Sequence, residues 1–166
     1  FEIALWSTSV LLIVVPFILL KQDDYLTLLA SIIGASFLIL NAKGNPIGQV
    51  LTIIFSMLYG VISYGFSYYG EMITYLCMSM PMAFIALVSW LKNPYKGKKS
   101  QVKVNSISRR EAILLVFVTI IVSIVFYFIL KYFNTANLIP STFSVTTSFF
   151  AAYLTFRRSP YFALAY

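Results

Sequence analysis

A row of polar side chains runs through one stretch of an otherwise apolar sequence. Its members lie three or four residues apart: Gln49, Thr52, Ser56, Tyr59, Ser63 and Ser67. On a helix this spacing places all six on one face. Amide and hydroxyl groups arranged in this way can hydrogen-bond a small polar solute without reacting with it. The alternative is that the row only joins neighbouring helices, because Ser, Thr and Gly commonly pack membrane helices together.

Two further stretches repeat this pattern less regularly. The first offers Glu71, Tyr75, Ser79, Met82 and Ser89, and the second offers Ser141, Ser144, Ser148 and Thr155. In lipid every polar group needs a partner, so these faces must look toward other helices or a watery cavity.

The residue types that most reactions need are missing. The sequence has no His and a single Cys, Cys77, too few of the usual ligands for zinc, haem or an iron–sulfur cluster. It has no glycine-rich phosphate loop and no paired carboxylates for acid–base catalysis. We therefore expect no enzyme activity, no cofactor and no metal.

The composition indicates an integral membrane protein. Of 166 residues, 60% are hydrophobic and 10% charged, with a mean hydropathy of +0.88. Soluble domains are about 25% charged, and disordered chains are poor in aromatic residues, which make up 17% here. A soluble globular protein and a disordered chain are both excluded.

The fold predicted is an all-α, multi-pass helical bundle. A helix needs about 20 mostly apolar residues to cross a bilayer. Six complete runs fit, and a seventh starts at Tyr161 and is cut off at Tyr166, so we expect the chain to be truncated in its seventh span. The six runs are Ile3–Leu20, which Pro16 interrupts, Tyr25–Leu40, Ile47–Tyr69, Met72–Trp90, Ala112–Leu130 and Leu138–Phe156.

The basic residues predict the orientation. If the loop at 92–111 faces the cytoplasm, alternating spans put ten of the twelve Lys and Arg residues on that side, as membrane proteins prefer. They are Lys43, Lys92, Lys96, Lys98, Lys99, Lys103, Arg109, Arg110, Arg157 and Arg158. The N-terminus then also faces the cytoplasm. Topology explains the formal charge of +7 without nucleic acid, and contact with anionic lipids is an additional possibility.

A weak internal similarity suggests a duplicated bundle. Ser36–Pro46 resembles Ser148–Pro160: each is a helix end, a basic turn and then a Pro. Both turns fall on one side of the membrane, so the copies are parallel. The plan expected is an extra N-terminal helix (residues 1–22), a first three-helix repeat (25–91), a basic cytoplasmic loop (92–111), a linker helix (112–133) and an incomplete second repeat (138–166).

Several segments resemble PnuC-type vitamin transporters. They are Asn45-Pro46-Ile47-Gly48-Gln49 through Leu58-Tyr59-Gly60, then Tyr68-Tyr69-Gly70-Glu71, then Ser89-Trp90-Leu91. The similarity is best over Tyr25–Trp90 and looser over Phe143–Tyr166. It implies a three-plus-one-plus-three bundle of parallel repeats, similar to SWEET sugar transporters and often a trimer. It also implies facilitated diffusion of nicotinamide riboside through the cell membrane, for NAD synthesis.

The resemblance directs attention to particular residues as the substrate site. We expect Gln49, Ser56 and Tyr59 to hydrogen-bond the ribose or amide, with Tyr75 and Ser79 opposite them. Glu71 is expected to act as an outer gate or to attract a cation. In the family an aromatic residue, commonly Trp, precedes an Asn in the helix after the second basic turn. Tyr166 takes the aromatic position, and the sequence stops before any Asn.

Two alternatives remain open at this stage. Thiamine, another vitamin or a sugar fits the same fold as the transported solute. A protein of another class, a membrane scaffold that transports nothing, would use the polar rows only to hold helices together.

Overall fold

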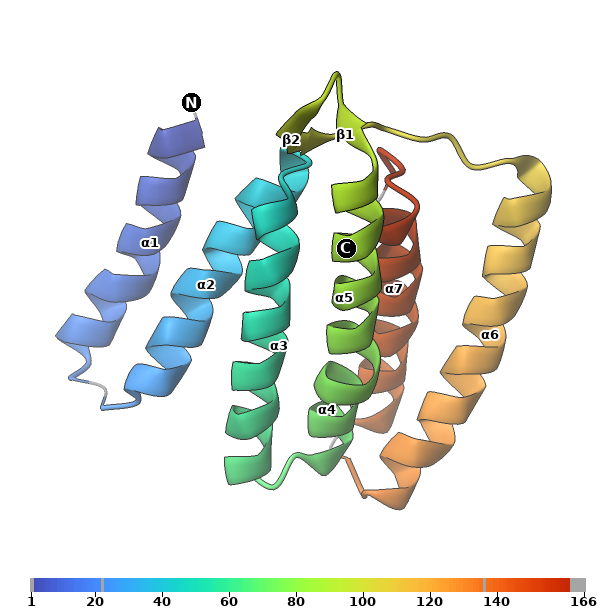
Figure 1. Ribbon diagram of the computed structural model, residues 1–166. Coiled ribbons are helices and arrows are strands. Elements are labelled where there is room, and N and C mark those ends of the chain that lie inside the picture. The colour runs from blue at the N-terminus through green and yellow to red at the C-terminus, as the bar shows by residue number, and fades with distance from the viewer. Residues whose placement is uncertain (1, 22, 136, 162–166) are drawn as a thin grey trace.

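The structure, a computed structural model, describes residues 2–21, 23–135 and 137–161 as a row of helices that run up and down side by side (Figure 1). The helices are α1 (Glu2–Leu19), α2 (Tyr25–Ala42), α3 (Pro46–Gly65), α4 (Tyr69–Ile73), α5 (Met80–Lys92), α6 (Arg109–Tyr132) and α7 (Leu138–Phe156). A π-helical turn, η1 (Thr74–Ser79), joins α4 to α5. Two short antiparallel strands, β1 (Pro94–Tyr95) and β2 (Lys98–Val102), form a hairpin between α5 and α6.

The connections gather at two ends of the molecule. The start of α1, the turn after α2, the hairpin and the turn after α7 share one end, at the top of Figure 1, which we call the hairpin end. The connections α1–α2, α3–α4 and α6–α7 share the opposite, distal end. All ten basic residues predicted to lie on one side of a membrane belong to segments at the hairpin end.

Four helical spans in the described part of the chain are long and apolar enough to cross a bilayer by length and composition. They are Tyr25–Ala42, Pro46–Gly65, Tyr69–Lys92 and Arg109–Tyr132, and Ile3–Leu19 is a shorter apolar helix. α7 is 19 residues long and rich in Ser and Thr, so its polar face needs partners within the protein.

Helix ends follow the local sequence. The Asp24 carboxylate accepts hydrogen bonds from the Thr27 hydroxyl (2.6 Å) and the Thr27 backbone N–H (3.1 Å), which lower the pKa of Asp24 and start α2. Asn45 accepts from the Ile47 N–H, and Pro46 occupies the first turn of α3, where its missing N–H costs nothing. Ser108 accepts from the Glu111 N–H, so α6 begins at Arg109, inside the predicted loop 92–111.

The third span is shorter than predicted. α3 ends at Gly65, whereas the apolar run continued to Tyr69, because Ser67 adopts a left-handed conformation (φ 60°) and the Tyr68 N–H donates to the Ser63 carbonyl. This bond closes the helix in a Schellman motif. The prediction that Ser67 belongs to the polar face is therefore wrong, and the remaining five members of the row lie within α3.

The fourth span contains an irregularity that the apolar pattern did not indicate. It starts at Tyr69 instead of Met72 and passes through η1 just before Pro81. Proline has no N–H to donate, and its ring clashes with the carbonyl four residues earlier in a regular α-helix. A wider turn before Pro81 relieves both problems.

The hairpin crosses over one end of the bundle. Lys96 (φ 47°) and Gly97 (φ 76°) form its two-residue loop, in which both residues need positive φ. The chain that leaves β2 then contacts both basic turns: the Val102 N–H donates to the Gly44 carbonyl (2.9 Å), and the Asn105 N–H donates to the Arg158 carbonyl (3.1 Å). The segment from Val102 to Asn105 therefore connects the ends of α2 and α7.

Candidate functional site

Two adjoining cavities lie between α2, α3, the η1–α5 span and α7. The cavity toward the hairpin end has a volume of about 210 Å³, and the distal cavity has a volume of about 160 Å³. Tyr75, Ser79 and Ser148 line both cavities, so the two adjoin at these side chains. Further polar residues are Asn41, Gln49, Thr52, Ser56 and Thr155 in the first cavity, and Tyr59, Glu71, Thr74, Ser141 and Ser144 in the second.

The structure brings together the predicted site residues that it describes. Gln49 and Ser56 line the first cavity, Tyr59 and Glu71 line the distal one, and Tyr75 and Ser79 line both. Tyr166 lies outside the described residues. The polar face of α3 is turned into the bundle: Gln49 is 2% exposed and Ser56 is 1% exposed.

A chain of amide and hydroxyl groups forms the wall of the first cavity nearest the hairpin end. The Gln49 side-chain amide donates to Asn41 Oδ1 (2.9 Å), and the Asn41 amide donates to Thr52 Oγ1 (3.2 Å). Gly48 allows this contact, because a Cβ there would lie 2.3 Å from Asn41 Oδ1 and 2.8 Å from the Asn41 backbone nitrogen. Each group keeps hydrogen-bonding capacity that a polar solute could use.

Four aromatic rings form a continuous cluster beside these amides. Ring centroids lie 5.2 Å apart for Phe37–Phe55, 5.4 Å for Phe55–Tyr59 and 4.5 Å for Tyr59–Tyr75. Phe55 and Tyr75 border the first cavity, and Tyr59 and Tyr75 border the second. Such surfaces stack on planar rings and attract cations.

The described linings of the two cavities contain an acidic side chain but no basic one. Glu71 is the one carboxylate in their described linings, and no Lys or Arg is among those residues. A positively charged solute is therefore favoured over an anion.

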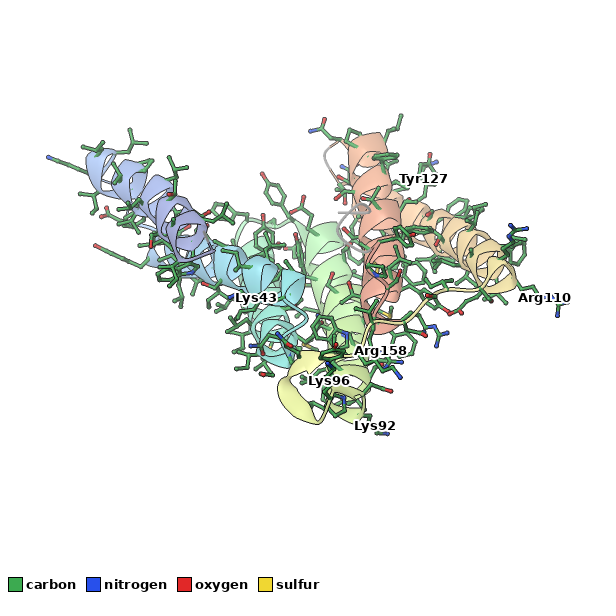
Figure 2. The ribbon with its side chains drawn as sticks, turned by 90° about the horizontal axis from the view of Figure 1, so that it is seen from above. Lys43, Lys92, Lys96, Arg110, Tyr127 and Arg158 are labelled. Atoms are coloured by element: carbon green, nitrogen blue, oxygen red, sulfur yellow. The ribbon has the colours of Figure 1, made fainter. Side chains whose placement is uncertain are left out.

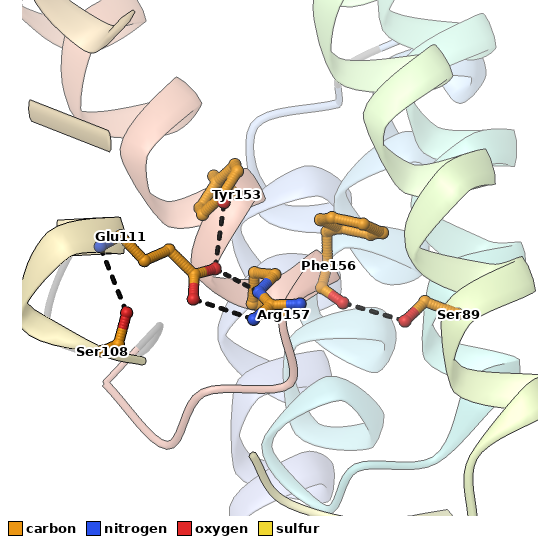
Figure 3. A network of polar contacts seen from close by, with 6 residues as sticks. All are labelled: Ser89, Ser108, Glu111, Tyr153, Phe156 and Arg157. Carbon is orange, nitrogen blue, oxygen red and sulfur yellow. Dashed lines mark hydrogen bonds and ion pairs between the residues drawn. The ribbon is translucent and has the colours of Figure 1, made fainter. Parts of the chain in front are cut away.

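Side chains at the hairpin end fix α7 against its neighbours. The Trp90 indole N–H donates to the Thr155 carbonyl (2.8 Å) and Ser89 Oγ donates to the Phe156 carbonyl (3.0 Å), which holds α5 to α7. On the other side of α7, Glu111 of α6 forms an ion pair with Arg157 and accepts a hydrogen bond from the Tyr153 hydroxyl (3.0 Å) (Figure 3). The hydrogen bond to Glu111 raises the pKa of Arg157.

Comparison of the sequence with models of known protein families assigns the chain to one of them. A family model described as nicotinamide mononucleotide transporter matches residues 24–166. The chain belongs to this nicotinamide mononucleotide transporter family. The resemblance to PnuC-type transporters is thereby confirmed.

The chain is also similar to one curated protein and to one solved structure. The nicotinamide riboside transporter PnuC of Neisseria mucosa is 26% identical over 121 residues, which are 71% of this chain and 46% of the relative. The chain thus spans about half the length of this curated relative. The crystal structure of the vitamin B3 transporter PnuC matches with a TM-score of 0.82 and 23% identity, over 99% of this chain and 71% of that one, and shows a common fold.

Membership of this family confirms several expectations from the sequence. The chain is a multi-pass, all-α membrane protein, as its composition predicts. The nicotinamide mononucleotide transporter family consists of transporters, so the expectation that the chain is not an enzyme is also confirmed. The family is described as one of transporters, which does not match the alternative of a membrane scaffold that transports nothing.

Sequence reasoning missed several cavity residues of this family member. Asn41 directly follows the apolar run Tyr25–Leu40, where a polar residue suggests a loop, but the structure buries it to 6% exposure. Phe37 and Phe55 carry no polar signal that distinguishes them from core residues. A buried amide could have been suspected at Asn41, because the turn that follows it brings Gln49 back alongside.

Proposed function

We propose that the protein carries nicotinamide riboside across the cytoplasmic membrane into the cell by facilitated diffusion, as a uniporter that supplies NAD synthesis. The observation that carries this proposal is the pair of adjoining cavities, whose linings combine aromatic rings in contact, amides and hydroxyls with one carboxylate. The substrate combines matching groups: a planar cationic pyridinium, an amide and a ribose.

The charge of the cavities supports a riboside over its phosphorylated form. A phosphate monoester carries about −1.5 to −2 charges at pH 7 and is normally bound by Arg, Lys or a cluster of N–H groups. The described cavity linings contain Glu71 and neither Arg nor Lys. Glu71 would repel the phosphate and attract the pyridinium.

The positions of the polar groups suggest how the substrate binds. The Gln49–Asn41–Thr52 chain and Ser56 offer donors and acceptors to the ribose or the carboxamide in the first cavity. Tyr75, with Tyr59 and Phe55 against it, offers a ring on which the pyridinium can stack. Glu71 lies at the distal end, where it attracts the cation as it enters.

The same arrangement supports a simple mode of transport and a topology. In the described linings, Glu71 is the one carboxylate, and it lies near the distal end, so the path has no buried chain of ionisable groups for a proton relay. We assign the hairpin end and the N-terminus to the cytoplasm, because the basic segments gather there.

We also propose that the protein is built on parallel repeats and assembles as a homo-oligomer, such as a trimer.

Uptake by reconstituted vesicles tests this function. Vesicles that contain the purified protein should take up labelled nicotinamide riboside saturably, and removal of proton and sodium gradients at a fixed membrane potential should leave the rate unchanged. Tyr75→Ala should reduce uptake at low substrate concentration roughly tenfold, since base–aromatic stacking is worth about 1–3 kcal/mol. Tyr64→Ala is the matched control, because Tyr64 is 64% exposed on α3.

The same assay separates the alternative substrates. Unlabelled nicotinamide riboside should compete fully, whereas excess thiamine or sugar should leave uptake largely unchanged. Stronger inhibition by thiamine than by nicotinamide riboside would reassign the transported vitamin. Absence of any saturable flux would contradict transport itself.

A further inference from the structure

The hydrogen-bonded amides beside the first cavity form a chain with a fixed direction. The Gln49 amide nitrogen donates to Asn41 Oδ1 (2.9 Å), and the Asn41 amide nitrogen donates to Thr52 Oγ1 (3.2 Å). The Thr52 hydroxyl in turn donates to the Gly48 carbonyl (2.8 Å). Asn41, Gln49 and Thr52 all line this cavity. Figure 2, which looks down on the hairpin end, shows α2, with Lys43 at its end, beside α3. The chain therefore joins two neighbouring helices at a wall of the cavity.

The direction follows from the hydrogen-bonding capacity of each group. A carbonyl oxygen only accepts, so the single hydrogen of the Thr52 hydroxyl is committed to Gly48. Thr52 Oγ1 must then accept, and Asn41 has to present its NH2 group to it. This leaves Asn41 Oδ1 to face Gln49, which has to present its own NH2 group in turn. Both side-chain amides are consequently held in one of their two orientations.

Gln49 is the member of the chain that keeps a free acceptor at the cavity. Its Oε1 accepts no hydrogen bond from the described residues, and unlike Ser63 Oγ this oxygen is not sealed from solvent. The side chain is only 2% exposed, so the oxygen is reached from the cavity that Gln49 lines. The amide nitrogen also keeps its second hydrogen. A buried acceptor without a partner is costly, so a solute that brings an N–H group is favoured here.

From these observations we propose that the first cavity selects a carboxamide, through a contact between its NH2 group and Gln49 Oε1. Gln49 is the specificity-determining residue, and Asn41 and Thr52 are positioning residues that hold it in the accepting orientation. This assignment rests on the proposed function, because it places the carboxamide of nicotinamide riboside against Gln49 while the pyridinium stacks on Tyr75.

Groups of similar shape lack the N–H that this wall requires. A methyl ketone offers only a carbonyl oxygen, and a carboxylate offers only oxygens and adds a negative charge that Glu71 disfavours in the adjoining cavity. Either group would leave Gln49 Oε1 without a hydrogen-bond donor. The ketone is the more informative comparison, since it leaves the charge of the solute unchanged.

Competition for uptake into vesicles that contain the purified full-length protein tests this selectivity. Labelled nicotinamide riboside is the transported probe, and the competitor is acetylpyridine riboside, in which a methyl ketone replaces the carboxamide. About tenfold more of this analogue than of unlabelled nicotinamide riboside should be needed to halve the uptake, as expected when one buried acceptor loses its partner. Because both values come from the same vesicles, their ratio does not depend on the amount of folded protein.

Two substitutions at one position separate the hydroxyl from the shape of the side chain. Thr52→Val keeps the shape but removes the acceptor for Asn41, so both amides can rotate and the ratio should approach one. Thr52→Ser keeps the hydroxyl and should keep the ratio of the parent protein. Thr142→Val is the matched control and should also keep it. The Thr142 hydroxyl likewise donates to the carbonyl four residues earlier, that of Leu138 (2.8 Å), but Thr142 is in the described lining of neither cavity.

Other outcomes would overturn the inference. A ratio near one in the parent protein would refute the selectivity, and an unchanged ratio in Thr52→Val would refute the role of the chain. The methylpyridinium versions of both solutes, in which a methyl group replaces the ribose, separate this inference from the proposed function. Amide-selective, Thr52-dependent uptake of the labelled methyl compound without uptake of the riboside would support the amide site and contradict the riboside as cargo. Saturable riboside uptake without selectivity would leave the proposed function intact and refute the amide site.

Discussion

At the scale of single residues, the substrate path depends on polar groups that are buried and yet keep partners. Gln49, Asn41 and Thr52 bond to one another across two helices, so none pays the full penalty of an isolated polar group in an apolar surrounding. Such a chain can exchange one partner for a substrate atom at little cost. Ser63 differs, because its hydroxyl oxygen is buried with no partner in the described structure.

Removing the charge of Glu71 tests its role at the distal cavity. Glu71→Gln keeps the size of the side chain but loses its attraction for a cation, so the KM for nicotinamide riboside should rise several-fold. A partly screened charge pair near 4 Å is worth about 1–4 kcal/mol, which sets the upper end of the effect. Initial rates of uptake over a range of substrate concentrations give the KM.

The control for Glu71 is Asp23→Asn. Asp23 is an exposed acidic residue in the α1–α2 connection, also at the distal end, and it lines neither cavity. Its removal should leave the KM unchanged. An equal rise for both variants would point to the general surface charge of this end and against a specific role for Glu71.

The sequence was informative about cavity residues where spacing and polarity coincided. Gln49, Ser56 and Tyr59 were found because a polar group in an apolar helix stands out and a three-or-four spacing defines its face. Ser67 was assigned to that face wrongly, since the pattern does not reveal that the helix closes at Gly65. Asn41 was missed because a polar residue near the end of a span looks like part of a loop.

At the scale of helices, the contact of α2 with α3 depends on the absence of a side chain at one position. Gly48→Ala would force the new methyl group against the Asn41 side chain and backbone. Overpacking of this kind costs about 1–3 kcal/mol, so the melting temperature in detergent should fall and uptake with it.

Gly65→Ala provides the comparison within the same helix. A Cβ at Gly65 would meet nothing within 4 Å. Because Ala loses less backbone entropy than Gly in a helix, this variant should be as stable as the parent or up to about 1 kcal/mol more stable. Similar melting temperatures for the two variants would show that α2 and α3 are less closely packed than described.

The Glu111–Arg157 pair joins α6 to the end of α7, and its strength can be measured by a double-mutant cycle. Glu111→Gln, Arg157→Gln and the double variant should give a coupling energy of about 0.5–1.5 kcal/mol in thermal or chemical unfolding, since the Arg157 side chain is 33% exposed and partly screened. A coupling energy near zero would show that the ion pair does not stabilise the packing of α6 against α7.

The pH dependence of this pair follows from the direction of the Arg157 shift. Because the pKa of Arg157 is raised, its side chain is charged in both the folded and the unfolded state at neutral pH, and its contribution is lost only as the pH rises through this strongly alkaline pKa. Titration of Arg157 should therefore not change the coupling between pH 6 and 9.

The helices themselves were predictable, but the irregular elements between them were not. Among the described residues, long apolar runs indicated each of the long helices, with end errors of a few residues. The hairpin was missed because its strands are short and basic, and the sequence Lys96-Gly97 is a weak sign of a two-residue turn. The π-helical turn leaves the apolar pattern unchanged, and only Pro81 hints at it.

At the scale of the whole molecule, the segregation of basic segments predicts a single orientation. In a Cys77→Ser background, a cysteine introduced at Lys96 should react with a membrane-impermeant maleimide only after the membrane is opened. A cysteine introduced at Asp23 should react in intact cells. These positions lie at opposite ends, in the hairpin and in the α1–α2 connection. The reverse labelling pattern would invert the proposed topology.

The short chain from Val102 to Asn105 sets a limit on how this end of the molecule can move. Its two backbone hydrogen bonds reach Gly44 and Arg158, in the turns that follow α2 and α7. Three residues of fully extended backbone span at most about 10 Å. The two turns can consequently separate only until this tether is taut, and any wider opening requires the rupture of one bond and the release of the hairpin from that helix.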